Sequence, residues 1–184
     1  MIQSNQNNGN KMMNKRKIRG FTILEVLIAI VLLSLGFLSM VALQGSAMKY
    51  SQTAYFRGIA SQIGNGLAAS IRANPKGVSD YKNTASYNPA PVIPSLGCTA
   101  SDTCTPTEVA NSDIAWARRS ANMQLPGGDV WIDNGKDSDG VTFVDIVLVW
   151  QDPQTKDGIN LPCPATVNVS AAENPQCLPM RVRL

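Results

Sequence analysis

The sequence contains no histidine and none of the common catalytic signatures. Without an imidazole the chain lacks the usual general base at neutral pH and the commonest metal ligand. It also has neither a Gly-x-Ser-x-Gly elbow nor a phosphate-binding loop. We therefore predict that the protein is not an enzyme and uses no cofactor, with an enzyme that relies only on carboxylates as the open alternative.

Acidic side chains are absent before Phe21, whereas five basic ones occur there: Lys11, Lys15, Arg16, Lys17 and Arg19. The rest of the chain has eleven basic and thirteen acidic side chains, a net charge of −2. The body therefore has no basic footprint for nucleic acid, and we predict that this chain binds none. A basic flank before an apolar span stays in the cytoplasm, which places the residues after Leu43 across the membrane.

Charge is also nearly absent from the apolar run between Phe21 and Leu43, where Glu25 is the only ionisable side chain. A run of about 23 residues is long enough to cross the hydrocarbon core of a bilayer as a helix. An ionisable group inside such a span costs a few kcal/mol and is a functional candidate by default. The alternative is that Glu25 lies near the end of the span and simply reaches for the headgroups.

Proline is missing until Pro75, so the chain can remain helical far beyond the membrane span. We predict one helix over residues 21–73, with residues 21–43 as its transmembrane half. Beyond Lys49 apolar residues recur at three- and four-residue steps, which is typical of an amphipathic helix: Phe56, Ile59, Ile63, Leu67 and Ile71. Asn74-Pro75 should end the helix. Gly58, Gly64 and Gly66 predict either a bend or the close approach of another backbone.

The four cysteines, Cys98, Cys104, Cys163 and Cys177, all follow the span, on the side where disulfides form and persist. Of the three possible connectivities, Cys98–Cys104 with Cys163–Cys177 closes the shortest loops and is the pairing we predict. A zinc site is the rival interpretation. It would need four thiolates at unusual spacings without any histidine, so we expect no metal site.

Residues 74–184 should form a small α+β head. Residues 75–104 are rich in proline and polar residues and predict a loop. Residues 105–124 predict a helix, capped by Thr105 or Thr107, with Ile114, Ala117 and Ala121 on one side. Residues 128–133 and 141–150 predict two strands joined by the turn 134–140, and residues 178–184 an edge strand. The 141–150 strand is apolar on both faces, which favours a central position. The predicted fold is a long N-terminal α-helix packed on a small antiparallel β-sheet.

Part of the turn 134–140 resembles a calcium-binding loop, because Asp137-x-Asp139-Gly140 matches a section of an EF-hand. However, Gly135 stands where the first acidic ligand belongs, and Ile146 where the closing glutamate belongs. We therefore predict a solvated hairpin connection, in which Asp, Asn and Gly tolerate the turn dihedrals.

The N-terminal pattern resembles a known family. The segment RKIRG, followed by FTILEVLIAIVLLSLGFLSM, is similar to the class III signal of type IV pilins. The resemblance implies that prepilin peptidase removes residues 1–20 by cutting between Gly20 and Phe21. It further implies that Phe21 becomes the N-methylated first residue, and that Glu25 serves subunit assembly by pairing with the terminal amine of a neighbour.

Within that superfamily, residues 25–50 and the segment SIRANPKGVSDY are most similar to the PilV family of minor pilins. Major pilins often carry a proline in the membrane half of the helix, and this chain has none. The implied partners are prepilin peptidase, other minor pilins, the major pilin and the pilus assembly platform. The implied location is the bacterial inner membrane, single-pass with the C-terminal part in the periplasm, and then the pilus.

Three other interpretations stay open. A minor pseudopilin of type II secretion would share the same signal and a similar body. A secreted binding protein could be released by signal peptidase after Ala47, although the apolar run is longer than a usual signal and contains Glu25. The third is a periplasmic module held by its signal anchor.

Overall fold

The computed structural model describes residues 20–95, 97–98, 103–152, 161–169 and 175–184. The chain divides into two compact units, Met1–Gln44 and Gly45–Leu184, and we name the second unit the head. Of the predicted leader, residues 1–20, only Gly20 lies within the described residues.

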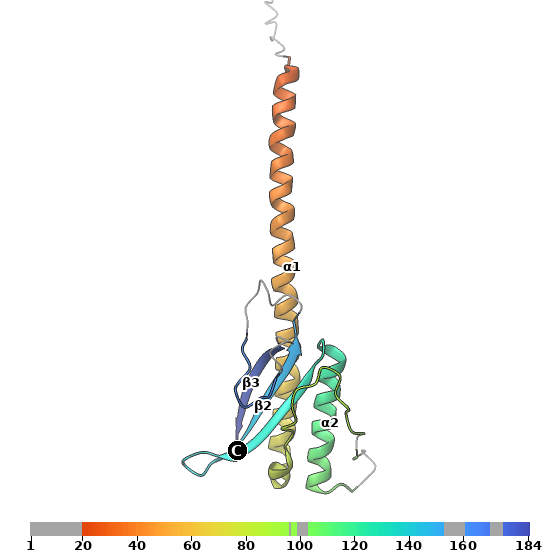
Figure 1. The fold of residues 1–184 in the computed structure, drawn as a ribbon, viewed down its shortest axis with the longest axis vertical. Helices are drawn as coiled ribbons and strands as arrows, with labels where there is room; N and C mark the ends of the chain where they lie inside the picture. The colour runs from red at the N-terminus through yellow and green to blue at the C-terminus, as the bar shows by residue number, and fades with distance from the viewer. Residues whose placement is uncertain (1–19, 96, 99–102, 153–160, 170–174) are drawn as a thin grey trace, which may run out of the picture. The chain divides into compact units, whose positions relative to one another are not determined.

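Helix α1 spans Ile23–Ala73 and passes through both units (Figure 1). It ends at the predicted point, before Asn74-Pro75. In the first unit all described side chains from Gly20 to Gln44 are exposed. In the head the predicted amphipathic face is buried at Phe56, Ile63, Leu67 and Ile71, and Ile59 is partly buried. The two halves of α1 therefore have different surroundings, although the backbone is helical in both.

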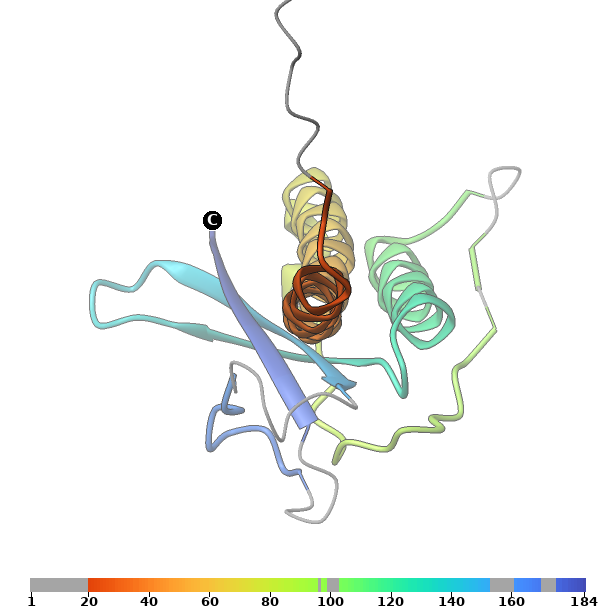
Figure 2. The same ribbon diagram turned by 90° about the horizontal axis from the view of Figure 1, so that it is seen from above.

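The head contains a three-stranded antiparallel sheet of β1 (Asp129–Lys136), β2 (Thr142–Gln151) and β3 (Pro175–Arg183). The strand order is β1-β2-β3, so the predicted central and edge positions of β2 and β3 are confirmed. Helix α2 spans Pro106–Gln124. It lies beside the head segment of α1 on one face of the sheet (Figure 2). This arrangement confirms the predicted α+β fold.

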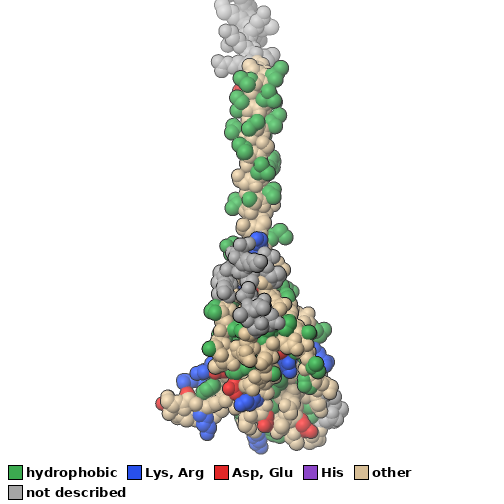
Figure 3. Space-filling model, in the orientation of Figure 1, with side chains coloured by type: hydrophobic (Ala, Val, Ile, Leu, Met, Phe, Trp, Pro, Cys, Tyr) green, Lys and Arg blue, Asp and Glu red, His purple; other side chains and the backbone are tan. Residues whose placement is uncertain are grey.

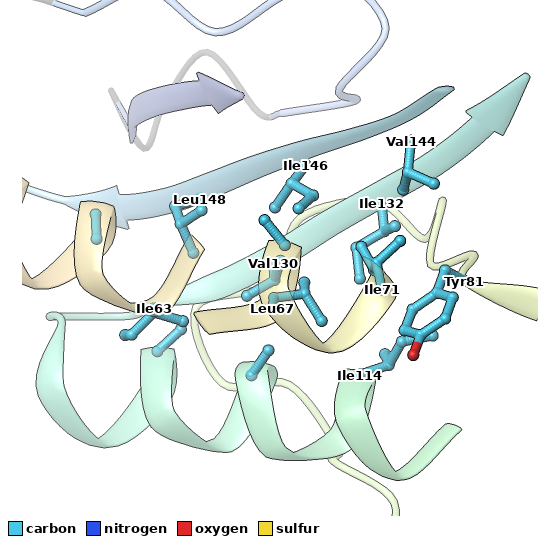
Figure 4. Packing of buried hydrophobic residues seen from close by; sticks show 14 of the residues in the cluster. Ile63, Leu67, Ile71, Tyr81, Ile114, Val130, Ile132, Val144, Ile146 and Leu148 are labelled. Carbon is cyan, nitrogen blue, oxygen red and sulfur yellow. The ribbon is translucent and has the colours of Figure 1, made fainter. Parts of the chain in front are cut away.

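The main core fills the space between the sheet and the two helices. Figure 4 shows Ile63, Leu67 and Ile71 of α1 packed against strand residues such as Ile146 and Leu148. The predicted α2 face is confirmed, because Ile114 is nearly buried and Ala117 and Ala121 are fully buried. A second, smaller core covers the opposite face of the sheet, built from Trp131, Val147, Val149, Val167 and Cys177. Strand β2 is therefore apolar on both faces because each face has a core of its own.

Thr105 caps α2 and settles the choice between Thr105 and Thr107. Its hydroxyl accepts the backbone N–H of Glu108 (3.3 Å), and the Glu108 carboxylate accepts the backbone N–H of Thr105 (2.8 Å). This reciprocal capping box satisfies two donors at the helix start. Thr107 instead donates its hydroxyl to the Asp80 carboxylate (2.9 Å), so it links α2 to the preceding segment.

Three sequence predictions were wrong in their boundaries. The edge strand β3 begins at Pro175, three residues before the predicted start. Residues 75–80, predicted as loop, form the 3-10 helix η1 (Pro75–Asp80), since proline at its first position fits a helical turn. The predicted turn 134–140 is too long, because Asn134, Gly135 and Lys136 continue β1 and pair with β2 down to Lys136 and Thr142. The Asn134 amide donates to the carbonyls of Ser79 (3.0 Å) and Tyr81 (3.1 Å), so a typical turn residue instead ties the strand to η1.

Gly64 allows β3 to pack closely on α1. A Cβ at this position would collide with the Met180 sulfur and would lie 3.1 Å from Leu148 Cδ2. The predicted close approach is thus made by side chains from the sheet, not by another backbone. A Cβ at Gly66 would lie at ordinary contact distance from the Trp116 ring, and one at Gly58 would meet no atom of the described residues within 4 Å.

Candidate processing and assembly segment

Residues 20–22 lie just outside the helix, and Thr22 closes its first turn. The backbone N–H of Glu25 donates to the Thr22 hydroxyl (3.2 Å) and to the Thr22 carbonyl (3.1 Å). A threonine that accepts from the third residue of a helix is a standard N-cap. With Thr22 as the cap, Ile23 is the first helical residue. The peptide bond between Gly20 and Phe21 is therefore not part of the helical hydrogen-bond ladder. Phe21 is 81% exposed, so this bond is open to an approaching protein.

Gly20 has no structural reason to be glycine in this chain. Its φ is not in the left-handed region, and a Cβ built on it would meet no atom within 4 Å. Neither backbone conformation nor packing within the described residues therefore excludes a larger side chain. A glycine next to an exposed, non-helical peptide bond is consistent with a requirement imposed by another molecule.

Glu25 lies in the first turn of α1, where the helix dipole favours a carboxylate. The other polar groups of the span are satisfied locally, since the Ser34 hydroxyl donates to Val31 O (2.8 Å) and Ser39 to Leu35 O (3.1 Å). The ion pairs formed among the described residues all lie in the head. Glu25 is therefore the one ionisable group that the described part of the span offers to a partner.

Around Glu25 the helix surface is apolar on every side. The large side chains from Val26 to Leu43 are between 47% and 72% exposed, and Figure 3 shows hydrophobic atoms along this stretch. Among the described residues α1 is the one helix long and apolar enough to cross a membrane. The described residues bury none of this surface, which is suited to contact with lipid or with other apolar helices.

All four cysteines are bonded in two disulfides, Cys98–Cys104 and Cys163–Cys177, with Cα–Cα separations of 6.0 and 4.8 Å. The structure thus has the pairing with the shortest loops and leaves no thiolate for zinc. No group of metal-ligating side chains occurs in the part of the chain that the structure describes. The Asp137 carboxylate instead accepts the backbone N–H of Val141 (2.9 Å) and a guanidinium N–H of Arg183 (2.6 Å), so it stabilises the hairpin connection.

Removing the two disulfides should have unequal effects on stability. Replacing Cys163 and Cys177 by serine opens the longer loop and puts a hydroxyl at the fully buried position 177 in the second core. We expect a loss of about 2–4 kcal/mol in the free energy of unfolding. The matched variant, serine at Cys98 and Cys104, should lose less because these side chains are only partly buried. Urea unfolding of the full chain in detergent measures both, and equal losses would contradict this ranking.

Sequence reasoning missed a partly buried polar cluster, centred on the buried Tyr81, that joins α1, η1 and α2. The Tyr81 hydroxyl donates to the Asp113 carboxylate (2.6 Å), and the Asn74 amide donates to the Pro106 carbonyl (2.8 Å). Burial and the Asp113 hydrogen bond raise the pKa of Tyr81 above its usual value, so the phenol stays a neutral donor. It also missed the Thr22 cap, for which the Thr-x-x-Glu spacing of Thr22 and Glu25 was the available signal.

Two models of known protein families match consecutive parts of this chain. Residues 15–41 match the prokaryotic N-terminal methylation motif. Residues 42–115 match the model of the type IV pilin Tt1218 family. No curated protein and no solved structure matches the chain.

Proposed function

Because the chain is a type IV pilin or pseudopilin with an N-terminal methylation motif, we propose that it is a minor pilin of the PilV type. In this proposal it is incorporated into a type IV pilus and helps to initiate its assembly. Prepilin peptidase cuts between Gly20 and Phe21, and Phe21 is then N-methylated. Residues 21–43 hold the subunit in the bacterial inner membrane, with the C-terminal part in the periplasm. Other minor pilins, the major pilin and the assembly platform are its partners in a tip or priming complex.

The observation that carries the proposal is the arrangement of Gly20, Phe21 and Glu25 at the start of an uncovered apolar helix. A peptidase needs an accessible, extended bond, and the Thr22 cap leaves Gly20–Phe21 outside the helix. The glycine has no packing role among the residues that the structure describes, which is what recognition by a second protein predicts. The apolar surface that follows must be covered, and both lipid and neighbouring pilin helices can cover it.

Glu25 gives a physical reason for ordered assembly. Cleavage creates an ammonium at Phe21, and methylation of the amine preserves its positive charge. In a core of packed apolar helices an unpaired carboxylate is costly, and the terminal ammonium of a neighbouring subunit would offset that cost. Glu25 would then be better satisfied in the filament than in the membrane, and it would set the register between subunits.

The absence of proline before Pro75 favours a minor over a major subunit. A minor pseudopilin of type II secretion is the second candidate, because the same N-terminal chemistry serves both filaments. The two differ in where the processed chain is found, in purified pili or in a secretion complex.

The mature N-terminus tests the proposal directly. Mass spectrometry of the protein from its native membrane should find methylated Phe21 as the first residue. The mass should be that of residues 21–184 with two disulfides and the added methyl. An intact leader, or a first residue at Met48, would exclude the pilin mechanism.

A further inference from the structure

The head carries an open groove on the face of the sheet opposite to α1 and α2. Its volume is about 420 Å³. Sheet residues and residues of the segment 161–169 line it: Trp131, Asp145, Val147, Pro179, Met180 and Arg181 from the sheet, and Pro164 and Thr166 from the segment. The Pro164 side belongs to the segment 161–169, which the Cys163–Cys177 disulfide ties to β3. The groove is therefore built on the sheet and a covalently held wall, and its shape is defined before any ligand binds.

The one pair of charged groups beside the groove is neutralised internally. Arg181 donates from Nε and Nη2 to the two oxygens of Asp145 at 2.6 and 2.7 Å. Its guanidinium also stacks over the Phe143 ring, 4.1 Å from the ring centroid. The groove thus offers an apolar floor and a charge-balanced rim, which suits an uncharged, mainly apolar ligand.

The same chain contains a surface segment that is uncharged and mainly apolar. Residues 90–94, Ala-Pro-Val-Ile-Pro, are five consecutive apolar residues, and no charged residue occurs between Lys82 and Asp102. Val92 is 92% exposed, the largest value among the exposed large hydrophobic residues of the described chain. Ala90, Val92 and Pro94 are exposed, whereas Pro91 and Ile93 are half-buried, and exposed apolar residues are unfavourable in a soluble surface unless they have a function. Proline-rich segments of this kind dock in aromatic-lined grooves at low entropic cost, because proline already restricts their backbone.

The segment is held away from the groove of its own chain. Tyr87 anchors one end by donating its hydroxyl to the Gly127 carbonyl (2.8 Å), and Cys98 anchors the other by donating its N–H to Ser112 of α2 (2.8 Å). Figures 1 and 2 show residues 88–95 running toward α2, whereas residues 161–169 lie beside β3. The segment therefore starts beside residues 161–169, where the Tyr87 N–H donates to the Asn168 carbonyl (3.0 Å), and runs from there toward α2, away from the groove.

We propose that the groove lined by Trp131, Val147, Pro164 and Thr166 binds the Pro91–Pro94 segment of a second copy of this chain. Because the segment and the groove are two different surface patches of one molecule, a contact between them is heterologous, and it extends in one direction where the rotation between copies does not close. Such a contact is the kind that a filament subunit needs, so the inference rests on the proposed assembly into a pilus. The heads of two subunits would then contact each other through this groove, separately from the contact between their apolar helices.

Photocrosslinking in the full chain tests this contact. A benzoylphenylalanine replaces Val92 in one tagged copy, and a second copy with a different tag is expressed beside it. After irradiation we expect a crosslinked dimer that contains both tags, with the crosslink mapped by mass spectrometry to residues 131–166 of the second copy. The same photoreactive residue at Met123, which is 79% exposed on α2, is the control and should not label the groove.

Directional variants separate binding from folding. Thr166→Trp fills the groove from an exposed position, so it should not disturb the core. Placed in the second copy, it should reduce the Val92 crosslink at least ~10-fold, as expected for loss of an interface anchor. Placed in the photoreactive copy it should have no effect. In the reciprocal experiment the photoreactive residue replaces Thr166, and Val92→Asp in the other copy should remove the crosslink.

Two outcomes would overturn the proposal. One is a Val92 crosslink that maps outside the groove or only to a different protein. The other is no dimer in a sample where Phe21 is the methylated N-terminus and the chain is present in filaments. The second result would leave the proposed pilin function intact, because processing and incorporation are measured in the same sample.

Discussion

Gly20→Val should abolish removal of the leader while leaving the fold of the chain unchanged. A Cβ at this position would meet no atom of the described chain within 4 Å, so stability and membrane insertion should stay as in the wild type. The peptidase, however, would have to place a branched side chain next to the reacting bond. Displacing reacting groups by about 1 Å can cost roughly 100-fold in rate, so almost all the protein should retain residues 1–20. Gel mobility and mass spectrometry of the membrane fraction measure the cleaved share.

Gly36→Val is the matched control for this prediction. Gly36 also has no neighbour within 4 Å and lies on the same apolar helix, but it is away from the bond to be cut. This variant should be processed normally. Normal cleavage of Gly20→Val, or equal loss of cleavage in both variants, would contradict the assignment of Gly20 as the cleavage position.

Glu25→Val should separate membrane insertion from assembly. The substitution makes the span more apolar, so the protein should enter the membrane at least as well as the wild type. Gly20 and Phe21 are unchanged, so cleavage should persist. Incorporation should fail, because the terminal ammonium of a neighbour would lose its partner in a core of low dielectric. Breaking a buried ion pair by removing one partner costs about 3–5 kcal/mol, which corresponds to a loss of at least roughly 100-fold.

Fractionation of sheared filaments and membranes measures this effect, with the N-terminus checked in both fractions. Ser34→Val is the control, because it also removes a polar group from the span, but one whose hydroxyl is bonded to its own helix. It should enter filaments normally. Normal amounts of Glu25→Val in purified filaments would reduce Glu25 to a residue that reaches for the headgroups. Loss from both fractions would indicate instability and would equally contradict an assembly role.

The residues of the candidate site could largely be predicted from the sequence because they are close together along the chain. Gly20, Phe21 and Glu25 lie within six consecutive positions, and the apolar run after them needs no tertiary partner to form a helix. The contribution of the structure is local. It shows that Thr22 caps the start of the helix just after the Gly20–Phe21 bond, and that Gly20 has no packing role among the described residues. The roles of these residues in cleavage, methylation and assembly involve other molecules and stay predictions.

The sequence by itself determined the elements whose signals are periodic or local. The end of α1 follows from Asn74-Pro75, and the central position of β2 from apolar residues on both faces. The start of α2 follows from a threonine cap, although the choice of Thr105 over Thr107 needed the structure. In each case the deciding interactions are within a few residues along the chain, or follow from burial of both faces of one strand. Such signals can be interpreted without knowing which elements pack against each other.

Only the tertiary structure decided the features that depend on distant residues. Asn134 and Gly135 have the composition of a turn, yet they continue β1 because Asn134 bonds the carbonyls of η1 and Gly135 makes room for the Phe143 ring. Gly64 is explained by Met180, which is more than a hundred residues away in the chain. The second core and the groove require the 161–169 segment to fold onto the outer face of the sheet. Local propensity cannot predict these features, because burial against a distant partner outweighs the small intrinsic preference of each residue.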